Sequence, residues 1–152
     1  MEWTTVAIKP LLEEIAQRMK QAYGTHINIT GDNLSILSDE AKLKQLLFIF
    51  LDNAKKYSEQ PIDVEIVTGA VVQIRITDYG VGIPQDDLPH LFDRFYRVDK
   101  ARNRQTGGTG LGLSIAKQLA QLLAIKIDMT STVGVGTTVT LSFTERGVDD
   151  AT

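Results

Sequence analysis

The sequence contains no cysteine among its 152 residues, which excludes disulfide bonds and thiolate metal sites and favours a reducing compartment. It has no apolar run long enough to span a membrane and no signal-peptide pattern at its start. The net charge of −3 gives no bulk electrostatic attraction to nucleic acid. What remains is one soluble globular domain, for which 43% hydrophobic residues supply a sizeable core.

Several catalytic and cofactor motifs are also missing. The sequence has neither a Gly-x4-Gly-Lys-Ser/Thr phosphate loop nor a strand-Gly-x-Gly-x-x-Gly-helix unit. It has no zinc-type cluster and no arrangement of nucleophile and base. The two histidines, His26 and His90, are interpreted as a strand residue and as a residue of an irregular segment.

Two glycine-rich patches, at residues 78–84 and 107–113, are the most informative feature that is present. The first ends an alternating, strand-like run with Asp78, Gly80 and Gly82, and the second opens a helical pattern. Glycines let backbone amides approach a ligand closely, and free amides at a helix start attract anions. A carboxylate to read a base and a glycine loop to hold phosphates together indicate a nucleotide.

Helical spacing over residues 39–57 places Asn53, Lys56 and Tyr57 at one end of a helix. An amide oxygen suits Mg²⁺, a lysine neutralises phosphate, and a tyrosine packs on a nucleotide. The alternative is that Asn53 is only a helix-terminal residue and Lys56 a solvated surface charge.

The remaining pattern mixes strands and helices without a regular βαβ alternation, which predicts an α+β fold with a mostly antiparallel sheet. The expected strands are 3–8, 26–30, 34–37, 62–68, 71–77, 125–130 and 137–143. The expected helices are one with Pro10 in its first turn that stops at Gly24, then 39–57, a short piece at 86–92, and 110–123. Residues 94–104 form a basic segment in an acidic protein, and taken alone this segment fits a solvated loop.

Five motifs in order resemble the ATP-binding catalytic domain of a bacterial sensor histidine kinase. This family lies within the wider group of DNA gyrase, heat-shock-90 chaperones and mismatch-repair ATPases. The motifs are Asp52-Asn53-Ala54-Lys55-Lys56-Tyr57-Ser58, Asp78-Tyr79-Gly80-Val81-Gly82-Ile83-Pro84, Leu91-Phe92-Asp93-Arg94-Phe95-Tyr96-Arg97-Val98-Asp99, Gly107-Gly108-Thr109-Gly110-Leu111-Gly112-Leu113-Ser114-Ile115-Ala116 and Ser131-Thr132-Val133-Gly134-Val135-Gly136-Thr137-Thr138. The resemblance covers nearly the whole chain.

The resemblance implies a two-layer α/β sandwich of the Bergerat type, with helices on one face of a mixed, mostly antiparallel sheet. Residues 1–145 would form the catalytic domain, with a flexible ATP lid at about 84–108 and a tail at 146–152. ATP and Mg²⁺ would be its cofactors.

The resemblance also assigns roles. Asn53 would ligate Mg²⁺, Lys56 and Arg97 would act as catalytic charges at the phosphates, and Asp78 would accept a hydrogen bond from the adenine amine. The implied nucleotide-binding residues are Asn53, Lys56, Tyr57, Asp78, Gly80, Gly82, Ile83, Arg97, Gly108, Thr109, Gly110, Leu111, Gly112, Leu113 and Thr137.

Two departures from the family pattern stand out. Ile49 occupies the position of a frequent second asparagine, and Leu123-Ala124-Ile125 replaces a His-Gly-Gly turn. The chain also lacks a phosphoacceptor histidine, because neither His26 nor His90 is followed by an acid.

The expected function is therefore ATP-dependent protein histidine kinase activity on a separate dimerisation and phosphoacceptor domain, with a response regulator downstream and no nucleic-acid partner. The isolated domain would be a monomer and the parent a homodimer in the bacterial membrane, with this domain in the cytoplasm. The alternatives are an ATP-gated binding module without transfer and an anti-sigma-type protein-serine kinase.

Overall fold

The computed structural model of the chain describes residues 1–94, 96 and 112–143, apart from the side chain of Tyr57. Its elements, in chain order, are β1 (Thr4–Ala7), α1 (Ile8–Tyr23), β2 (Ile27–Thr30), β3 (Ser35–Ser38), α2 (Glu40–Tyr57), β4 (Ile62–Val67), β5 (Val72–Asp78), a 3₁₀ helix (Leu88–His90), α4 (Gly112–Leu123), β6 (Ile125–Thr132) and β7 (Gly136–Phe143). Among the described residues, no helix is both long enough and apolar enough to cross a membrane.

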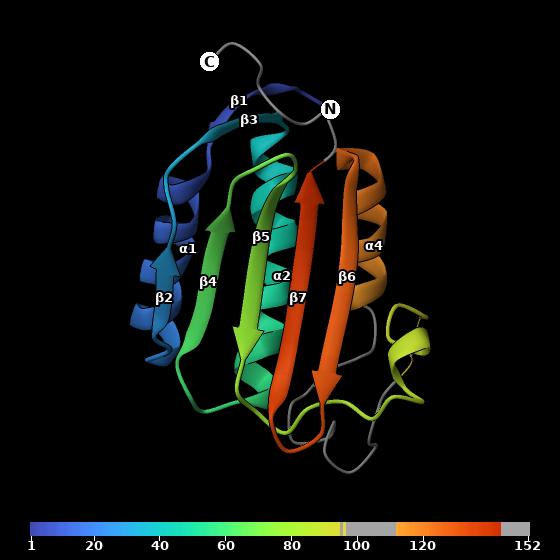
Figure 1. Cartoon of the computed structure of the whole chain (residues 1–152). Coiled ribbons are helices and arrows are strands. Elements are labelled where there is room, and N and C mark those ends of the chain that lie inside the picture. Colours follow the sequence, from blue (N-terminus) through green and yellow to red (C-terminus); the bar gives the residue numbers. More distant parts are fainter. Residues whose placement is uncertain (95, 97–111, 144–152) are drawn as a thin grey trace.

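The fold is a two-layer sandwich, with α1, α2 and α4 against one face of a sheet (Figure 1). The five strands lie in the order β2-β4-β5-β7-β6, and only β2 and β4 pair in parallel. β1 and β3 form a separate antiparallel ribbon. The expectation of an α+β fold with a mixed, mostly antiparallel sheet and helices on one face is confirmed.

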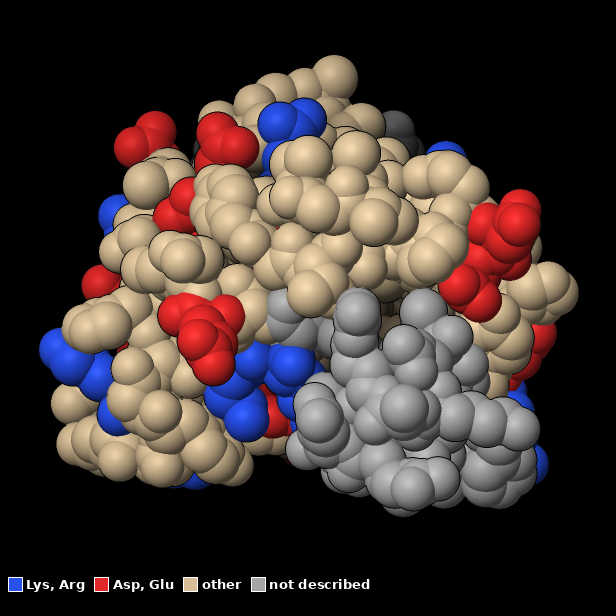
Figure 2. All heavy atoms as spheres, turned by 90° about the horizontal axis from the view of Figure 1, so that it is seen from below, with Lys and Arg blue, Asp and Glu red and all other residues tan. Residues whose placement is uncertain are grey.

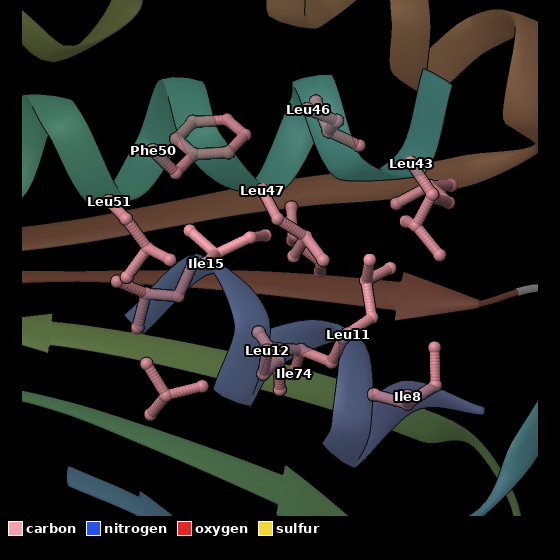
Figure 3. Close-up of a cluster of buried hydrophobic side chains, with 14 of the residues drawn as sticks. Ile8, Leu11, Leu12, Ile15, Leu43, Leu46, Leu47, Phe50, Leu51 and Ile74 are labelled. Atoms are coloured by element: carbon pink, nitrogen blue, oxygen red, sulfur yellow. The ribbon is translucent and has the colours of Figure 1, made fainter. Parts of the chain in front are cut away.

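The core lies between the sheet and the helices (Figure 3). In α1 and α2 the buried residues recur every three or four positions, so each helix turns one apolar stripe toward the sheet. The labelled core side chains are Ile8, Leu11, Leu12 and Ile15 from α1, Leu43, Leu46, Leu47, Phe50 and Leu51 from α2, and Ile74 from β5. This packing fixes α2, the helix that carries Asn53, against the sheet.

Asp39 caps α2, and it also holds the start of the chain. One carboxylate oxygen accepts the backbone N–H of Lys42 at 3.0 Å, and the other accepts that of Glu2 at 2.8 Å. These two donors lower the pKa of the Asp39 carboxyl, because both stabilise its ionised form. The chain entry and the first turn of α2 are thus held by one side chain.

Several expected strand bounds shift by one residue, and three regions differ in ways that have a clear reason. Ile8 begins α1 instead of ending β1, and its N–H donates to the carbonyl of Leu34 at 2.9 Å. The short helical piece expected over 86–92 is present but shorter, a single 3₁₀ turn at Leu88–His90, because such short segments rarely sustain an α-helix. The strands expected to end at 130 and to begin at 137 instead reach Thr132 and begin at Gly136.

The turn after α4 is made without glycine, as the sequence predicts. Ala124 takes a φ of 60°, the left-handed region, and it is the one non-glycine residue among those described with a positive φ. Its Cβ then crowds its own backbone, which costs roughly 1–2 kcal/mol. The corner between α4 and β6 therefore carries local strain.

We predict that Ala124→Gly stabilises the domain by about 0.5–1 kcal/mol, because glycine relieves this strain. The stabilisation is smaller than the strain itself, because glycine also raises the conformational entropy of the unfolded chain. Urea unfolding would measure the change. Ala16→Gly, in the middle of α1, is the control and should destabilise by about 1 kcal/mol. A loss of stability in Ala124→Gly would contradict the assignment of strain to this corner.

Candidate active site

Three buried polar side chains form a row across neighbouring strands at one end of the sheet. Asp78 ends β5, Thr137 lies opposite it on β7, and Ser131 lies opposite Thr137 on β6. They are 6%, 8% and 8% exposed. Alternation places all three on the face that the helices cover, in line with apolar residues of their own strands. The row is therefore a polar edge on an otherwise hydrophobic layer.

Asp78 is a carboxylate in a largely apolar setting. Burial raises the pKa of its carboxyl, while the backbone N–H groups of Gly80 and Thr137 lower it in part. The Gly80 N–H donates to Oδ1 at 3.0 Å. A buried carboxylate gains most from a further donor, so this position favours a ligand that presents an N–H.

The turn that follows Asp78 packs directly on the β6–β7 hairpin. Gly82 has a φ of 76°, and a Cβ there would lie 2.2 Å from the carbonyl oxygen of Thr132. Gly136 has a φ of 145°, and a Cβ there would lie 2.0 Å from the carbonyl oxygen of Asp78. Both glycines are therefore required for close backbone contact within the protein, whatever ligand the turn also approaches.

Tyr79, the residue after Asp78, makes its contacts on the opposite face of the sheet. Its hydroxyl donates to Oδ2 of Asp63 at 2.5 Å, and Oδ1 of Asp63 accepts from the Asn28 side chain at 3.2 Å. The bond to Asp63 raises the pKa of Tyr79. Asp78 and Tyr79 are thus anchored on opposite faces of the sheet, which fixes the direction of the chain between them.

The end of α2 brings basic side chains to this end of the molecule (Figures 1 and 2). Lys55 Nζ lies 4.2 Å from the centre of the Tyr23 ring and 3.7 Å from Asp52 Oδ1. Lys56 Nζ lies 3.3 Å from Asp52 Oδ2. Asn53, the next residue after Asp52, is half-buried. Lys55 is directed toward α1, so Lys56 is the lysine of this pair that a ligand beside Asn53 can use.

Gly112 and Leu113 start α4, which packs against α2. A Cβ on Gly112 would lie 3.9 Å from Cγ2 of Ile49, so the first residue of α4 lies beside that side chain. Ile49 and Leu113 are half-buried against the core. The structure thus brings the start of α4 beside the middle of α2, one turn before Asn53.

Six predicted site positions cannot be compared with the structure. The side chain of Tyr57 and the residues Arg97, Gly108, Thr109, Gly110 and Leu111 lie outside the described residues. Of the expected lid, 84–94 and 96 are described: Leu91 is buried, and the rings of His90 and Tyr96 stack with centroids 5.3 Å apart. In the described part of the chain, no three His, Asp or Glu side chains gather as a metal site.

Sequence reasoning missed the roles of Ser131 and Gly136. Ser131 follows Ile125, Ile127 and Met129 at two-residue steps, so a polar residue occupies a core-facing position. That break in the alternation was the available signal. Its meaning depends on strand register, which places Ser131 beside Thr137.

Comparison with solved structures places the fold. The domain superposes on a mycobacterial sensor histidine kinase, MprB, with a TM-score of 0.81 and 22% identity, over 93% of this chain and 97% of that one. Full-length ShkA, solved in complex with AMPPNP, gives a TM-score of 0.82 and 24% identity, over 100% of this chain and 32% of that one. The fold is that of the ATPase domains of histidine kinases.

Sequence comparison gives the family. The family model described as "Histidine kinase-, DNA gyrase B-, and HSP90-like ATPase" matches residues 38–147, and the chain belongs to this family. The sensor histidine kinase YkoH of Bacillus subtilis (strain 168) is 46% identical over 145 residues, which are 93% of this chain. The chain spans about a third of that relative, 32% of its length.

We predict that Gly136→Ala destabilises the domain by at least about 3 kcal/mol, because a Cβ there overlaps the Asp78 carbonyl and the backbone must move. Gly134→Ala is the matched control: its φ of 83° is also positive, but a Cβ would meet nothing within 4 Å. That variant should lose only about 1 kcal/mol. Equal losses in urea unfolding would show that the close approach at Gly136 is unimportant.

Proposed function

We propose that this chain binds Mg-ATP and transfers the γ-phosphoryl group to a histidine on a separate helical domain of a two-component sensor kinase. The observation that carries the proposal is Asp78, a buried carboxylate at a strand end. It lies in a chain that belongs to a family of ATPases and resembles sensor histidine kinases in sequence. The proposal also includes a longer parent protein, its phosphoacceptor domain and a response regulator downstream.

Base recognition follows from the polar row. Asp78 accepts hydrogen bonds only, and the adenine amine donates them, whereas guanine presents a carbonyl at the same position. Thr137 supports Asp78 through its backbone N–H. The turn of Gly80, Gly82 and Ile83 would line the base and ribose.

Phosphate binding would use the other half of the site. The Asn53 amide oxygen fits Mg²⁺, which accepts few protein ligands and completes its shell with water and phosphate oxygens. When bound, Mg²⁺ supplies charge neutralisation at the phosphates. Lys56, Arg97 and the amides at 108–113 would supply the rest. Tyr57 would flank the nucleotide.

Transfer requires a nucleophile that these residues do not provide. An imidazole nitrogen of the acceptor domain would form a P–N bond to the γ-phosphorus as the bond to the leaving ADP oxygen breaks. Positioning and charge neutralisation by this chain would be its whole contribution. In the parent, a homodimer in the bacterial membrane, the domain would lie in the cytoplasm with a flexible lid at 84–108, and isolated it would be a monomer.

We predict that Asp78→Asn weakens ATP binding about ten- to a hundredfold, because a buried hydrogen bond to a charged group contributes roughly 1.5–3 kcal/mol. Calorimetric titration would measure the affinity. Asp128→Asn on β6, which changes an exposed carboxylate on the open face of the sheet, is the control and should leave it unchanged. Unchanged ATP affinity in Asp78→Asn would remove Asp78 from the site.

We further predict slow phosphorylation of a histidine-bearing hairpin domain supplied in trans with Mg-ATP, since a free partner lacks the roughly millimolar effective concentration of a tethered one. The label on the hairpin should be acid-labile and base-stable, and this chain alone should acquire none. Asn53→Ala should abolish transfer but leave adenosine binding intact.

Two outcomes would favour one of the alternative functions over histidine phosphorylation. Acid-stable label on a serine or threonine of this chain would favour the serine-kinase alternative. Tight ATP binding without transfer to any hairpin would favour the ATP-gated binding module. Loss of adenosine binding and of the fold in Asn53→Ala would make Asn53 a structural residue.

A further inference from the structure

The Ser131 hydroxyl lies within hydrogen-bond distance of three polar groups. Its Oγ accepts the backbone N–H of Ile83 at 2.7 Å, donates to the carbonyl of Gly136 at 3.0 Å, and lies 2.7 Å from Oγ1 of Thr137. Its backbone carbonyl accepts from the Gln85 side chain at 2.8 Å. One residue therefore ties the turn after Asp78 to the β6–β7 hairpin.

Counting protons fixes the direction of the third bond. A serine hydroxyl has one hydrogen and two acceptor lone pairs. The Ile83 N–H can only donate, and the Gly136 carbonyl can only accept, so the single Ser131 hydrogen goes to Gly136. The one assignment that satisfies all three bonds has Thr137 donating its hydroxyl hydrogen to Ser131.

This assignment determines what Thr137 offers to a ligand. With its hydrogen committed to Ser131, Thr137 presents only lone pairs, and the Asp78 carboxylate beside it in register also accepts only. We propose that Ser131 is a positioning residue for base selection: by holding the Thr137 hydrogen away from Asp78, it keeps this edge acceptor-only and so selects a base that donates. The inference rests on the proposed function, because it takes the row as the base-reading edge.

A solely structural serine would behave differently. Removing such a serine would lower the stability of the turn and hairpin, and it would weaken the binding of all nucleotides to the same extent. A positioning serine also changes the choice between nucleotides, because the freed Thr137 hydroxyl can turn and donate, either to Asp78 or to a carbonyl on the base. The ratio of affinities therefore separates the two roles.

The experiment compares ATP with ITP, whose base carries a carbonyl where adenine carries the amine. Calorimetry should show ATP preferred by the unmodified chain. Ser131→Ala should reduce the ITP-to-ATP ratio of dissociation constants about three- to tenfold, the effect of one neutral hydrogen bond. In a Thr137→Val background, Ser131→Ala should leave the ratio unchanged, because no hydroxyl remains to turn.

Ser142→Ala is the matched control. Ser142 on β7 accepts from the Gln73 side chain at 3.1 Å, so this variant also breaks a cross-strand bond. It lies at the other end of the strand from Thr137 and should not change the ratio. Carbon-detected NMR titration gives a second readout: the pKa of Asp78 should fall in Ser131→Ala, where the Thr137 hydroxyl can donate to the carboxylate, and not in the double variant.

The unmodified chain provides a test that needs no folded variant. The Thr137 hydroxyl proton should show a nuclear Overhauser effect to the Ser131 methylene, and its absence would overturn the proposal. An unchanged ratio in Ser131→Ala, or a change that persists with Thr137→Val, would overturn it as well. Failure of the unmodified chain to bind ATP would instead overturn the proposed function.

Discussion

The antiparallel register of β5, β7 and β6 is the constraint on which the candidate site depends. It sets Asp78, Thr137 and Ser131 side by side on the face that the helices cover. A slip of one residue would turn all the side chains of a strand to the opposite face. The strand would then remove its polar residue from the site and its apolar residues from the core at the same time. Apolar side chains earlier in each strand therefore hold the register, and the hydrophobic core positions the polar row.

The same constraint explains how much the sequence could predict. The fold class and Asp78 follow from local patterns, because an alternating run over 71–77 predicts a strand that leads into this carboxylate. Thr137 is identified only through the resemblance to the family, and the structure shows that both residues face the core. The bond between Ile83 and Ser131 joins residues 48 positions apart, and no local pattern encodes it. Sequence spacing also cannot tell that Lys55 turns toward Tyr23 while Lys56 does not.

Glycine shows a further limit of reading motifs alone. The sequence associates Gly82 with close approach of backbone to ligand, which stays a prediction. The structure supplies a separate reason, because the turn would collide with Thr132 if a Cβ were present. A glycine in a ligand-binding motif can thus be required by the protein's own packing. At Gly82, packing on Thr132 and close approach to a ligand would both exclude a Cβ. Loss of binding in a glycine variant would not by itself identify a ligand contact.

Ile49 shows how an apolar residue can serve a polar site. The resemblance leads one to expect a second asparagine here, yet the structure has an isoleucine, and Gly112 at the start of α4 lies beside it. Residues four apart share a helix face, so Asn53 stands one turn beyond that contact on the same side of α2. The substitution removes an amide but holds α4 beside the face that carries Asn53. The position of the proposed metal ligand relative to α4 therefore depends on packing by its neighbour, and the missing oxygen is one that water or phosphate can supply.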